Sequence, residues 1–371
     1  MKTYRVRFVD PAANYRSIRK EIDAAYRDVM SKGDLIDRGQ LKSFESHLAR
    51  FVGTKYAVGL NSGYDALHMS LRALGIGPGD EVIVPAHTFV ATCSAVVNAG
   101  AVPVLVDVSG DFNIDVNRIE EAVTERTKAI IPVHLSGYMA DMPKIMKIAQ
   151  KHDLKVIEDA CQSLGSSIDS RRAGSWGHAG CWSFYPFKIL GGYGDGGAIT
   201  TNDPDVALFA TRMRYNGEDR DTGEYHGHGF TCLLDNLQAA FLDVKLRHLP
   251  AWILKRKKIA QRYRESLSDL KGLVLPHYDR KGFDHVYQNY TVRSDRGSEF
   301  SDFLKANGVE VLTQFRKPYY KHPGLKLADR GFPETEAISR EVCSLPMNTE
   351  LTDAEVDYVI STVRKFYKKG R

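Results

Sequence analysis

The sequence predicts an α/β protein with a mostly parallel central sheet flanked by helices and a smaller C-terminal α+β domain. Between Tyr56 and Asp159, short and nearly continuous apolar runs alternate with helical patterns. This alternation is typical of parallel strands that are buried on both faces. Beyond a boundary placed near Pro250, a strand, a helix, a strand and a final helix form a shorter series. We therefore expect one domain at residues 1–250, which includes an N-terminal arm, and another at residues 251–371.

The composition narrows the class of protein. The chain has 371 residues and a formal net charge of +5, which is small for this length and gives no clustered basic patch for nucleic acid. No apolar run approaches the ~18 residues of a membrane span, and the start, MKTYRVRFVDPAANY, lacks the apolar region of a signal peptide. The five cysteines are scattered without metal-ligand spacing, which favours a reduced, cytoplasmic protein without a metal site.

The elements follow in chain order. Two amphipathic helices at Tyr15–Met30 and Gln40–Phe51 come first, and Gly33 and Gly53 end them. We expect strands at Tyr56–Leu60, Glu81–Val84, Val102–Val106, Ala129–Val133, Lys155–Glu158, His285–Val292 and Val309–Leu312. We expect further helices after Ser62–Gly63 and at His87–Asn98, Val116–Ala122, Met142–His152, Asp205–Tyr215, Asp235–Leu246, Ala251–Leu270 and Glu299–Asn307. A final helix follows Leu351, where Thr352 and Glu355 have the spacing of a capping box.

One lysine stands in an unusual setting. In SFYPFKILGGYGDGGAITT, residues 183–201, Lys188 lies between an aromatic segment and a run of glycines. Alone, this pattern more often marks a surface lysine beside a flexible loop. However, Asp159 ends a buried strand, and Ser62–Gly63 opens a helix whose free N–H groups suit a phosphate, with a plain helix cap as the alternative. Because ligands bind at the carboxyl ends of parallel strands, these groups should share one edge of the sheet.

A lysine, a carboxylate and a phosphate seat are the three parts that pyridoxal phosphate requires. The lysine forms a Schiff base, and the carboxylate keeps the pyridine nitrogen protonated by opposite-charge stabilisation. A nicotinamide enzyme would share the sheet pattern, but no G-x-G-x-x-G follows the first strand. The sequence therefore favours a site for pyridoxal phosphate.

The motifs EDACQSLGSS and SFYPFKILGGYGDGGAITTND resemble the DegT/DnrJ/EryC1/StrS family of sugar aminotransferases. The resemblance covers nearly the whole chain, including T-F-x-A-T at Thr88–Thr92 and the ending SLPMNTELTDAEVDYV. It implies the fold of fold-type-I, aspartate-aminotransferase-like enzymes, with pyridoxal phosphate bound by the larger domain. It also implies ping-pong transfer of an amino group from glutamate to a nucleotide-linked keto-sugar, with dTDP favoured as the nucleotide. The active site would be shared between the subunits of a homodimer.

The resemblance further implies the roles of single residues. Lys188 would form the Schiff base, Asp159 would pair with the pyridine nitrogen, and Phe89 would stack on the ring. Gln162 would bond the ring hydroxyl and Ser183 the phosphate. The complete set of cofactor contacts would be Ser62, Gly63, Tyr64, Phe89, Asp159, Gln162, Ser183 and Thr231. The candidate substrate contacts are Tyr185, Tyr319 and His322.

The chain departs from the family pattern at two places. Tyr64 stands where the family usually has threonine, so only its backbone contact transfers. Thr231 and Leu233 stand where the family commonly has the Asn and Arg that serve the neighbouring subunit's active site. The arginine contact that the family makes to the cofactor or substrate is then missing here or supplied by another arginine. Arg214 and Arg316 are candidates, with a structural salt bridge as the alternative for each.

Three functional alternatives remain at this point. S-F-Y-P-x-K-x-L-G-x-Y-G-D-G-G is similar to members that aminate a 3-keto sugar, such as a 3-keto-6-deoxyhexose. Members acting at C4 more often have histidine at the position of Tyr185, so C4 is the second choice. A third possibility, a cofactor-binding sensor or regulator without turnover, is disfavoured by the intact Lys188 and Asp159. Dehydratases of the family replace the lysine by histidine, so Lys188 favours transamination.

Overall fold

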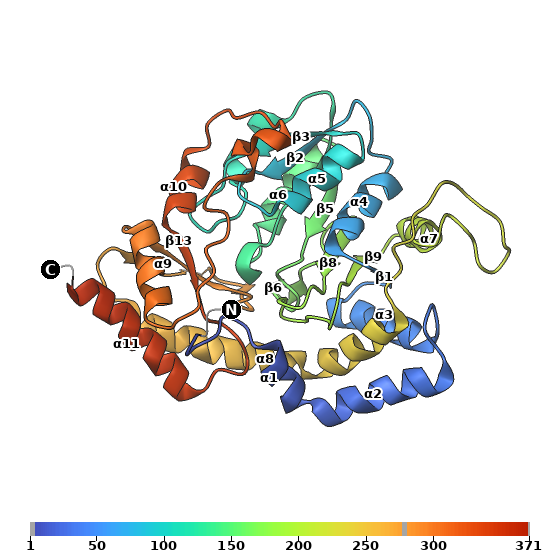
Figure 1. The fold of residues 1–371 in the computed structure, drawn as a ribbon. Helices are drawn as coiled ribbons and strands as arrows, with labels where there is room; N and C mark the ends of the chain where they lie inside the picture. The colour runs from blue at the N-terminus through green and yellow to red at the C-terminus, as the bar shows by residue number, and fades with distance from the viewer. Residues whose placement is uncertain (1–3, 277–279, 370–371) are drawn as a thin grey trace.

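The computed structural model describes residues 4–276 and 280–369 (Figure 1). Its larger unit is built on one sheet of seven strands: β1 (Tyr56–Leu60), β2 (Glu81–Pro85), β3 (Val102–Val106), β4 (Thr127–Ile130), β5 (Lys155–Asp159), β8 (Ala179–Ser183) and β9 (Gly197–Thr201). The strand order is β1-β9-β8-β5-β4-β2-β3. Only β9 runs antiparallel to its neighbours β8 and β1, and the other pairs are parallel. The predicted mostly parallel sheet is confirmed.

Helices cover both faces of this sheet. The helices are α1 (Pro11–Ser17), α2 (Arg19–Lys32), α3 (Gly39–Val52), α4 (Gly63–Ala73), α5 (Val90–Asn98), α6 (Met142–Lys151), α7 (Pro204–Met213), α8 (Asn236–Leu267), α9 (Gly297–Ala306), α10 (Pro333–Glu341) and α11 (Asp353–Lys369). In β2, Ile83 packs in a core with α3, α6 and α8, whereas Val82 and Val84 pack in a second core with α4, α5 and α7. Burial on both faces explains why the strands are apolar at successive positions.

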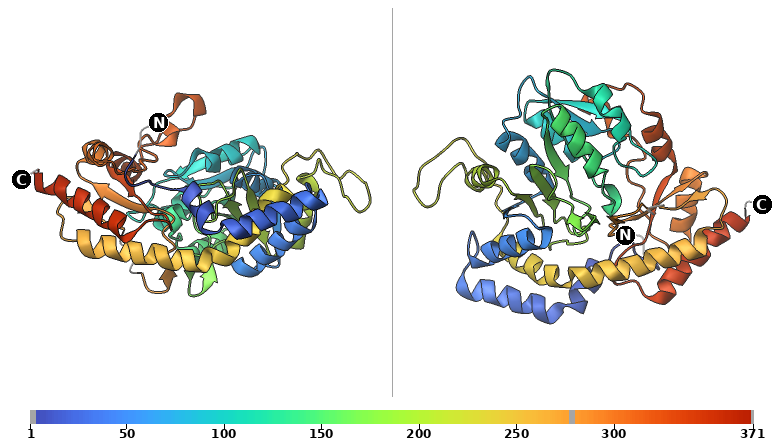
Figure 2. Two further views of the ribbon diagram at one scale, coloured as in Figure 1. Left: turned by 60° about the horizontal axis from the view of Figure 1, so that its bottom comes forward. Right: turned by 180° about the vertical axis from the view of Figure 1, so that it is seen from behind.

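Helix α8 runs without interruption through Pro250, so the prediction of two helices separated there is wrong. A proline inside a helix removes one backbone hydrogen bond. Leu249 and Ile253, on either side of it, are nevertheless buried in the same core, and this packing maintains the helix. Figure 2 shows α8 extending from the larger unit to the C-terminal helices. The division at residue 250 stays a prediction, and it falls inside this helix.

The C-terminal part contains an antiparallel sheet of β10 (Leu273–Val274), β12 (Tyr290–Ser294) and β13 (Val342–Leu345). The strand predicted at His285–Val292 therefore begins later, at Tyr290. The strand predicted at Val309–Leu312 is wrong, because its two ends form only isolated bridges, to Val6 and Ser344. Val6 is buried in the C-terminal core, so the N-terminal arm packs on this part of the molecule.

Other predicted boundaries shift by a few residues. Helix α5 begins at Val90 instead of His87, because Phe89 is extended with φ −71° and ψ 144°. The helix predicted at Val116–Ala122 is two short 3₁₀ turns, Val116–Arg118 and Glu120–Ala122. A small sheet joins β6 (Ser167–Ile168), β7 (Arg171–Arg172) and β11 (Phe283–Asp284).

The capping box of α11 is confirmed. Thr352 Oγ1 accepts a hydrogen bond from Glu355 N at 3.3 Å, and Thr352 N donates to Glu355 Oε2 at 2.8 Å. Within residues 4–276 and 280–369, none of the helices has the length and apolarity that a bilayer crossing requires. The same residues contain no cluster of three or more His, Cys, Asp or Glu side chains suited to a metal.

Candidate active site

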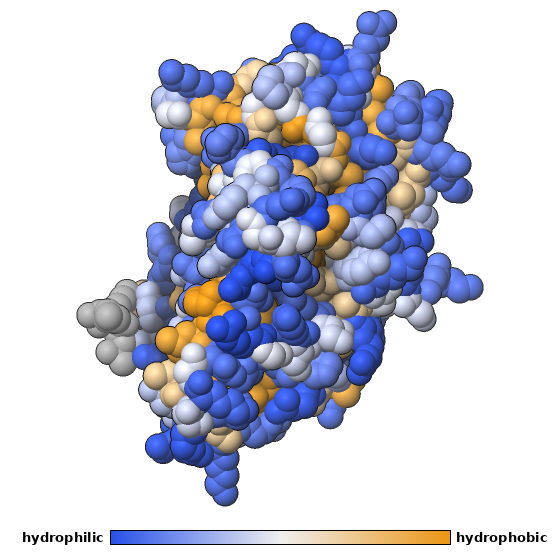
Figure 3. All heavy atoms as spheres, turned by 90° about the vertical axis from the view of Figure 1, so that its right-hand side faces the viewer, coloured by the Kyte–Doolittle hydropathy of each residue, from blue (hydrophilic) through white to orange (hydrophobic). Residues whose placement is uncertain are grey.

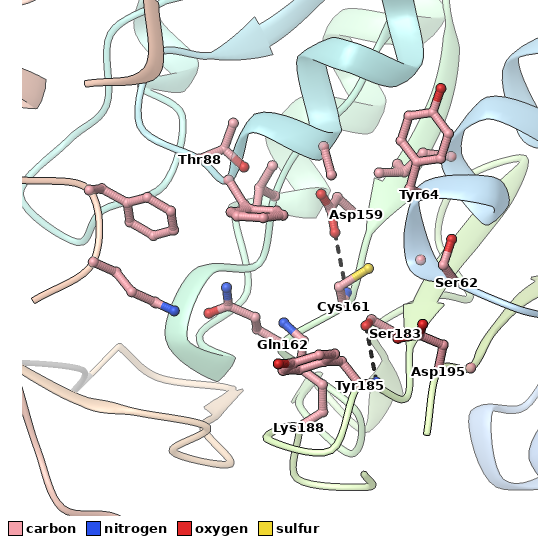
Figure 4. Close-up of a pocket in the computed structure, with 18 residues that line it drawn as sticks. Ser62, Tyr64, Thr88, Asp159, Cys161, Gln162, Ser183, Tyr185, Lys188 and Asp195 are labelled. Atoms are coloured by element: carbon pink, nitrogen blue, oxygen red, sulfur yellow. Dashed lines mark hydrogen bonds between the residues drawn. The ribbon is translucent and has the colours of Figure 1, made fainter. Parts of the chain in front are cut away.

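A cavity of about 420 Å³ opens at the carboxyl ends of the central strands (Figure 4). Its volume lies within the roughly 300–1,000 Å³ of small-molecule sites. The lining residues are Ser62, Gly63, Tyr64, Leu67, Thr88, Phe89, Ala91, Val133, Asp159, Cys161, Gln162, Ser183, Tyr185, Lys188, Asp195, Gly196, Gln314 and Phe315. Nine of the predicted site residues therefore meet in one cavity, and Lys188, Asp159 and Ser62–Gly63 are among them, as their shared sheet edge predicted. Three do not: Thr231, Tyr319 and His322.

Lys188 is carried by the loop between β8 and β9. Phe184, the first residue of this loop, is bonded to two later ones: its N–H donates to Gly196 O and its carbonyl accepts from Gly192 N, each at 2.7 Å. A Cβ atom on Gly191 would lie 2.4 Å from the carbonyl oxygen of Pro186, so only glycine fits at this close approach. The glycine run thus closes a tight loop that presents Lys188 to the cavity.

Asp159 is the last residue of β5, and it is buried. One carboxylate oxygen accepts a hydrogen bond from Thr92 Oγ1 at 2.8 Å, and the other accepts from Cys161 N at 3.3 Å. Thr88 Oγ1 lies 2.8 Å from Thr92 Oγ1 and completes a chain of two hydroxyls. Thr92 comes from α5, which follows a different strand, and sequence reasoning did not assign it to Asp159. These bonds fix the direction of the carboxylate.

Gln162 is also held in place. Its Oε1 accepts a hydrogen bond from Ser136 N at 2.9 Å. Ser136 has a left-handed backbone with φ 57°, which turns its N–H toward the amide. Since the oxygen is occupied, the NH₂ group of Gln162 is the part of the amide that can donate to a ligand. This donor fits the predicted partner of a ring oxygen.

The start of α4 forms the floor of the cavity. Ser62 caps the helix, since its Oγ accepts from Asp65 N at 3.0 Å and donates to Asp65 Oδ2 at 2.6 Å. A Cβ atom on Gly63 would lie 2.7 Å from Cys161 Sγ and 2.9 Å from Ser183 Cβ. Glycine at this position therefore lets the start of α4 pack directly against Cys161 and Ser183, so that Gly63 and Ser183 line the cavity together. The helix cap and the anion seat are both compatible with this geometry.

Tyr64 directs its hydroxyl away from this seat. Its oxygen accepts a hydrogen bond from Asn98 Nδ2, on α5, at 2.6 Å. Its side chain consequently cannot take the part of a threonine at the start of the helix. This agrees with the expectation that only the backbone of Tyr64 contributes.

The aromatic walls are open to the cavity. Phe89, just before α5, is 57% exposed, and Tyr185 is 48% exposed although its ring packs edge-on against Phe187. Across the cavity lie Gln314 and Phe315, which sequence reasoning missed. Phe315 has φ 62° and packs edge-on against His87, with ring centroids 5.3 Å apart. Burial lowers the pKa of His87 to about 4.

Comparison with known proteins identifies the chain. The model of the DegT/DnrJ/EryC1/StrS aminotransferase family matches residues 16–364. The chain belongs to this family. The predicted family and fold are confirmed: a crystal structure of S. venezuelae DesV in complex with a ketimine intermediate is 39% identical, covers 99% of both chains and has a TM-score of 0.95.

Other members of the DegT/DnrJ/EryC1/StrS family carry informative names. The dTDP-3-amino-3,4,6-trideoxy-alpha-D-glucose transaminase of Streptomyces venezuelae is 39% identical over 99% of this chain and 98% of that protein. A "pleiotropic regulatory protein" of Geobacillus stearothermophilus is 39% identical over 98% of this chain and 99% of that protein. The structure of ntda from Bacillus subtilis with bound cofactor PMP is 31% identical, has a TM-score of 0.91 and covers 99% of this chain and 86% of that one.

The departures from the family pattern can now be placed. Thr231 is exposed and lies outside the cavity, with its Oγ1 bonded to Asn216 Oδ1 at 3.1 Å. Arg214 is buried and forms an ion pair with Glu45 and a bond to Gly59 O, which is the structural alternative foreseen for it. Arg316 donates to Ser301 Oγ at 2.7 Å. Neither arginine lines the cavity of its own chain.

Two predicted substrate contacts lie elsewhere in the structure. Tyr319 is buried, and its hydroxyl donates to Pro85 O at 3.1 Å and accepts from Cys93 Sγ at 3.0 Å. These bonds hold the C-terminal part against the end of β2. His322 is exposed at the surface and does not line the cavity. Neither residue therefore lines the cavity of its own chain.

Proposed function

We propose that this chain is a pyridoxal-phosphate-dependent aminotransferase that moves an amino group from glutamate to a dTDP-linked 3-keto sugar. The observation that carries the proposal is the meeting of Lys188, Asp159 and Gln162 with the start of α4 in one cavity. A lysine amine, a fixed carboxylate, an amide donor and an anion seat are useful together only to a ligand that has all four complementary groups. The membership of this chain in the DegT/DnrJ/EryC1/StrS aminotransferase family supports the same activity.

The residues fit this cofactor. Lys188 would hold it covalently, Asp159 would pair with its ring nitrogen, and Phe89 would cover one face of the ring. Ser183 and the start of α4 at Gly63, where a Cβ would meet Cys161 and Ser183, would hold the phosphate. The bound cofactor supplies an electron sink for the carbon that carries the amino group. Lys188, released when the amino donor binds, would take a proton from that carbon and return it.

The choice of sugar rests on two supports. Tyr185, which lines the cavity, belongs to the sequence form that resembles the members acting on 3-keto sugars. A 39% identical relative is named as a transaminase of a dTDP-linked 3-amino sugar. The alternative is amination at C4, and a panel of 3- and 4-keto nucleotide sugars distinguishes the two positions by which sugar gains nitrogen.

A homodimer follows from the resemblance, and the shape of the chain supports it. The segment between α7 and α8, which contains Thr231, projects from the larger unit (Figure 1). Within it, Tyr225 is 69% exposed. A projecting segment with an exposed aromatic side chain is suited to reach a second subunit, and in this family that region serves the neighbouring site.

The half-reaction with glutamate tests the activity directly. Purified protein loaded with pyridoxal phosphate should convert one equivalent of glutamate to 2-oxoglutarate per site, and then stop until a keto-sugar is added. Lys188→Ala should abolish this conversion. A Lys188→Ala protein that converts glutamate at the wild-type rate would refute the proposed role of the lysine.

A regulator without turnover is the second candidate, because a 39% identical relative is named as a pleiotropic regulatory protein. The two functions predict different absorption spectra. An enzyme's cofactor band shifts when glutamate is added, whereas the band of a sensor without turnover stays unchanged. An unchanged band in protein that has bound the cofactor would favour the regulator.

A further inference from the structure

The side chain of Gln288 is bonded to the backbone on both sides of Lys188. Its Oε1 accepts a hydrogen bond from Ile189 N at 2.6 Å, and its Nε2 donates to Phe187 O at 3.0 Å. Gln288 is 6% exposed, so water does not compete for these groups. We propose that Gln288 is a positioning residue that fixes the direction in which Lys188 leaves its loop. This inference rests on the role of Lys188 in the proposed function.

An amide is the side chain that this position requires. Gln288 must accept from one peptide group and donate to another at the same time, which neither a carboxylate nor an ammonium can do. A lysine side chain is long, so a backbone rotation of about 10–20° would displace its amine by on the order of 1 Å. A misplacement of this size can cost about 100-fold in rate.

The backbone around Gln288 is itself fixed. Tyr287 has a left-handed backbone with φ 52°, and this bend directs the following residue back toward the Lys188 loop. Arg256, on α8, is buried and donates from Nη1 to the carbonyls of Tyr287, Gln288 and Met347 at 3.0, 3.2 and 2.7 Å. A buried cation that bonds three carbonyls anchors this short segment to α8.

The same segment supports the Gln162 side of the cavity. Asn289 N donates to Ser136 O at 3.3 Å, and Ser136 N in turn donates to Gln162 Oε1 at 2.9 Å. A Cβ atom on Gly137 would lie 2.8 Å from Gln288 N, which shows how closely the two segments approach. Residues 286–289 therefore hold the Lys188 loop and the Gln162 turn in one fixed relation.

The chain offers a matched control in Gln238. Its Oε1 accepts from Tyr193 N at 2.9 Å, so it is also a glutamine bonded to the Lys188 loop. That bond reaches Tyr193, within the run of glycines, and does not flank Lys188. Gln288→Leu and Gln238→Leu each remove a glutamine side chain that is bonded to the Lys188 loop from outside it. Only Gln288→Leu should change the position of Lys188.

Two readouts without turnover test the proposal. In protein loaded with pyridoxal phosphate, hydrogen exchange at the Ile189 amide should rise at least tenfold in Gln288→Leu and stay at the wild-type rate in Gln238→Leu. Borohydride reduction traps the cofactor on Lys188, and mass spectrometry of the peptide measures the rate of trapping after pyridoxal phosphate is added. This rate should fall about tenfold or more in Gln288→Leu alone.

Kinetics add a third readout. With glutamate deuterated at C2, the isotope effect on the half-reaction should increase in Gln288→Leu, because proton transfer by a misplaced lysine becomes the slow step. Gln288→Glu, which keeps the acceptor and loses the donor, should lie between wild type and Gln288→Leu, and it serves if Gln288→Leu does not fold.

The result that overturns the proposal is clear. It would be a folded Gln288→Leu or Gln288→Glu protein whose exchange, trapping rate and isotope effect equal those of Gln238→Leu. If wild-type protein fails to convert glutamate, the proposed function fails instead. The exchange and trapping rates would still test Gln288, because they need only the cofactor.

Discussion

At the scale of single residues, the chemistry of the site depends on partners that are remote in sequence. Asp159 was predicted from its place at the end of a strand, whereas Thr92, which bonds it at 2.8 Å, lies on helix α5, 67 residues earlier in the chain. A carboxylate that pairs with a ring nitrogen must point in one direction, and two hydrogen bonds to its oxygens set that direction. We therefore propose that Thr92 holds Asp159 in the direction that its proposed pairing with the ring nitrogen requires.

We predict that Thr92→Val weakens the binding of pyridoxal phosphate. A hydrogen bond to a charged group contributes about 1.5–3 kcal/mol, so the dissociation constant should rise by about 10–100-fold. Titration of the unloaded protein, followed by absorbance, measures it. Thr92→Ser keeps the hydroxyl and should bind within a few-fold of wild type. Equal affinity of Thr92→Val and wild type would contradict the assigned role of this bond.

His87 should make the stability of the protein depend on acid pH. Burial lowers its pKa from 6.5 to about 4, so between these values the unfolded chain binds a proton at His87 that the folded chain does not. The contribution of His87 to the free energy of unfolding is therefore fully present above pH 6.5, and about 3 kcal/mol of it is lost as the pH falls to 4. Urea unfolding measures the free energy of unfolding of wild type and of His87→Gln at each pH. As the pH falls from 6.5 to 4, the value for wild type should fall by about 3 kcal/mol relative to that for His87→Gln. A constant difference would contradict it.

Sequence reasoning located the residues that carry distinctive chemistry, and it missed those that act through packing or through hydrogen bonds to remote backbone groups. Lys188 and Asp159 were identifiable because their side chains and settings are unusual. Phe315 and Gln288 were not, because a phenylalanine or glutamine has no distinctive local pattern, and only the fold brings them to the Lys188 loop or the cavity. Tyr319 and His322 were placed by the resemblance, and neither lines the cavity of its own chain: Tyr319 is buried beside the end of β2, and His322 is exposed.

At the scale of elements, the starts of two helices provide a test. Gly63 begins α4 and Gly39 begins α3. A Cβ at Gly63 would meet Cys161 Sγ at 2.7 Å, whereas a Cβ at Gly39 would have nothing within 4 Å. The two glycines therefore occupy the same helical position, but only Gly63 is needed for close approach.

We predict that Gly63→Ala destabilises the fold by about 1–3 kcal/mol through overpacking. It should also reduce the affinity for pyridoxal phosphate by tenfold or more, because the added methyl group displaces Ser183 or the start of α4. Gly39→Ala should be neutral or stabilise the protein by up to about 1 kcal/mol. Thermal unfolding and cofactor titration measure both effects. A Gly63→Ala protein that behaves like Gly39→Ala would show that the seat tolerates a side chain.

The elements themselves were largely predictable, with instructive exceptions. Strands buried on both faces have continuous apolar runs, and the Thr352–Glu355 spacing marked a true capping box. The break expected at Pro250 was wrong because core packing of α8 outweighs one lost hydrogen bond. The strand expected at Val309–Leu312 was wrong because its apolar residues are buried without a continuous partner strand.

At the scale of the whole molecule, the cavity wall combines distant parts of the chain. The sheet and α4 supply one side, and Gln314 and Phe315 from the C-terminal part supply the other. On the face that looks to the right in Figure 1, hydrophobic residues interrupt a mostly hydrophilic surface (Figure 3). The exposed large apolar side chains from α2 to the start of β1 are Tyr26, Met30, Leu35, Ile36 and Tyr56. Such side chains are suited to contact a second subunit.

We predict a homodimer in solution. Light scattering coupled to size exclusion should give a mass twice that of one chain, over a range of protein concentrations at which the enzyme is assayed. The physical reason is that the exposed apolar side chains and the projecting segment gain burial only against another subunit. Full activity in a sample that elutes entirely as a monomer would contradict a shared active site.

The transfer of nitrogen tests the central claim most directly. Protein loaded with pyridoxal phosphate is incubated with ¹⁵N-glutamate and dTDP-, UDP- and GDP-linked 3- and 4-keto sugars, and mass spectrometry identifies which sugar gains the label. The account predicts that a dTDP-linked 3-keto sugar gains ¹⁵N with wild-type protein and remains unlabelled with Lys188→Ala. Absence of label from every keto-sugar, or equal labelling by Lys188→Ala, would contradict it.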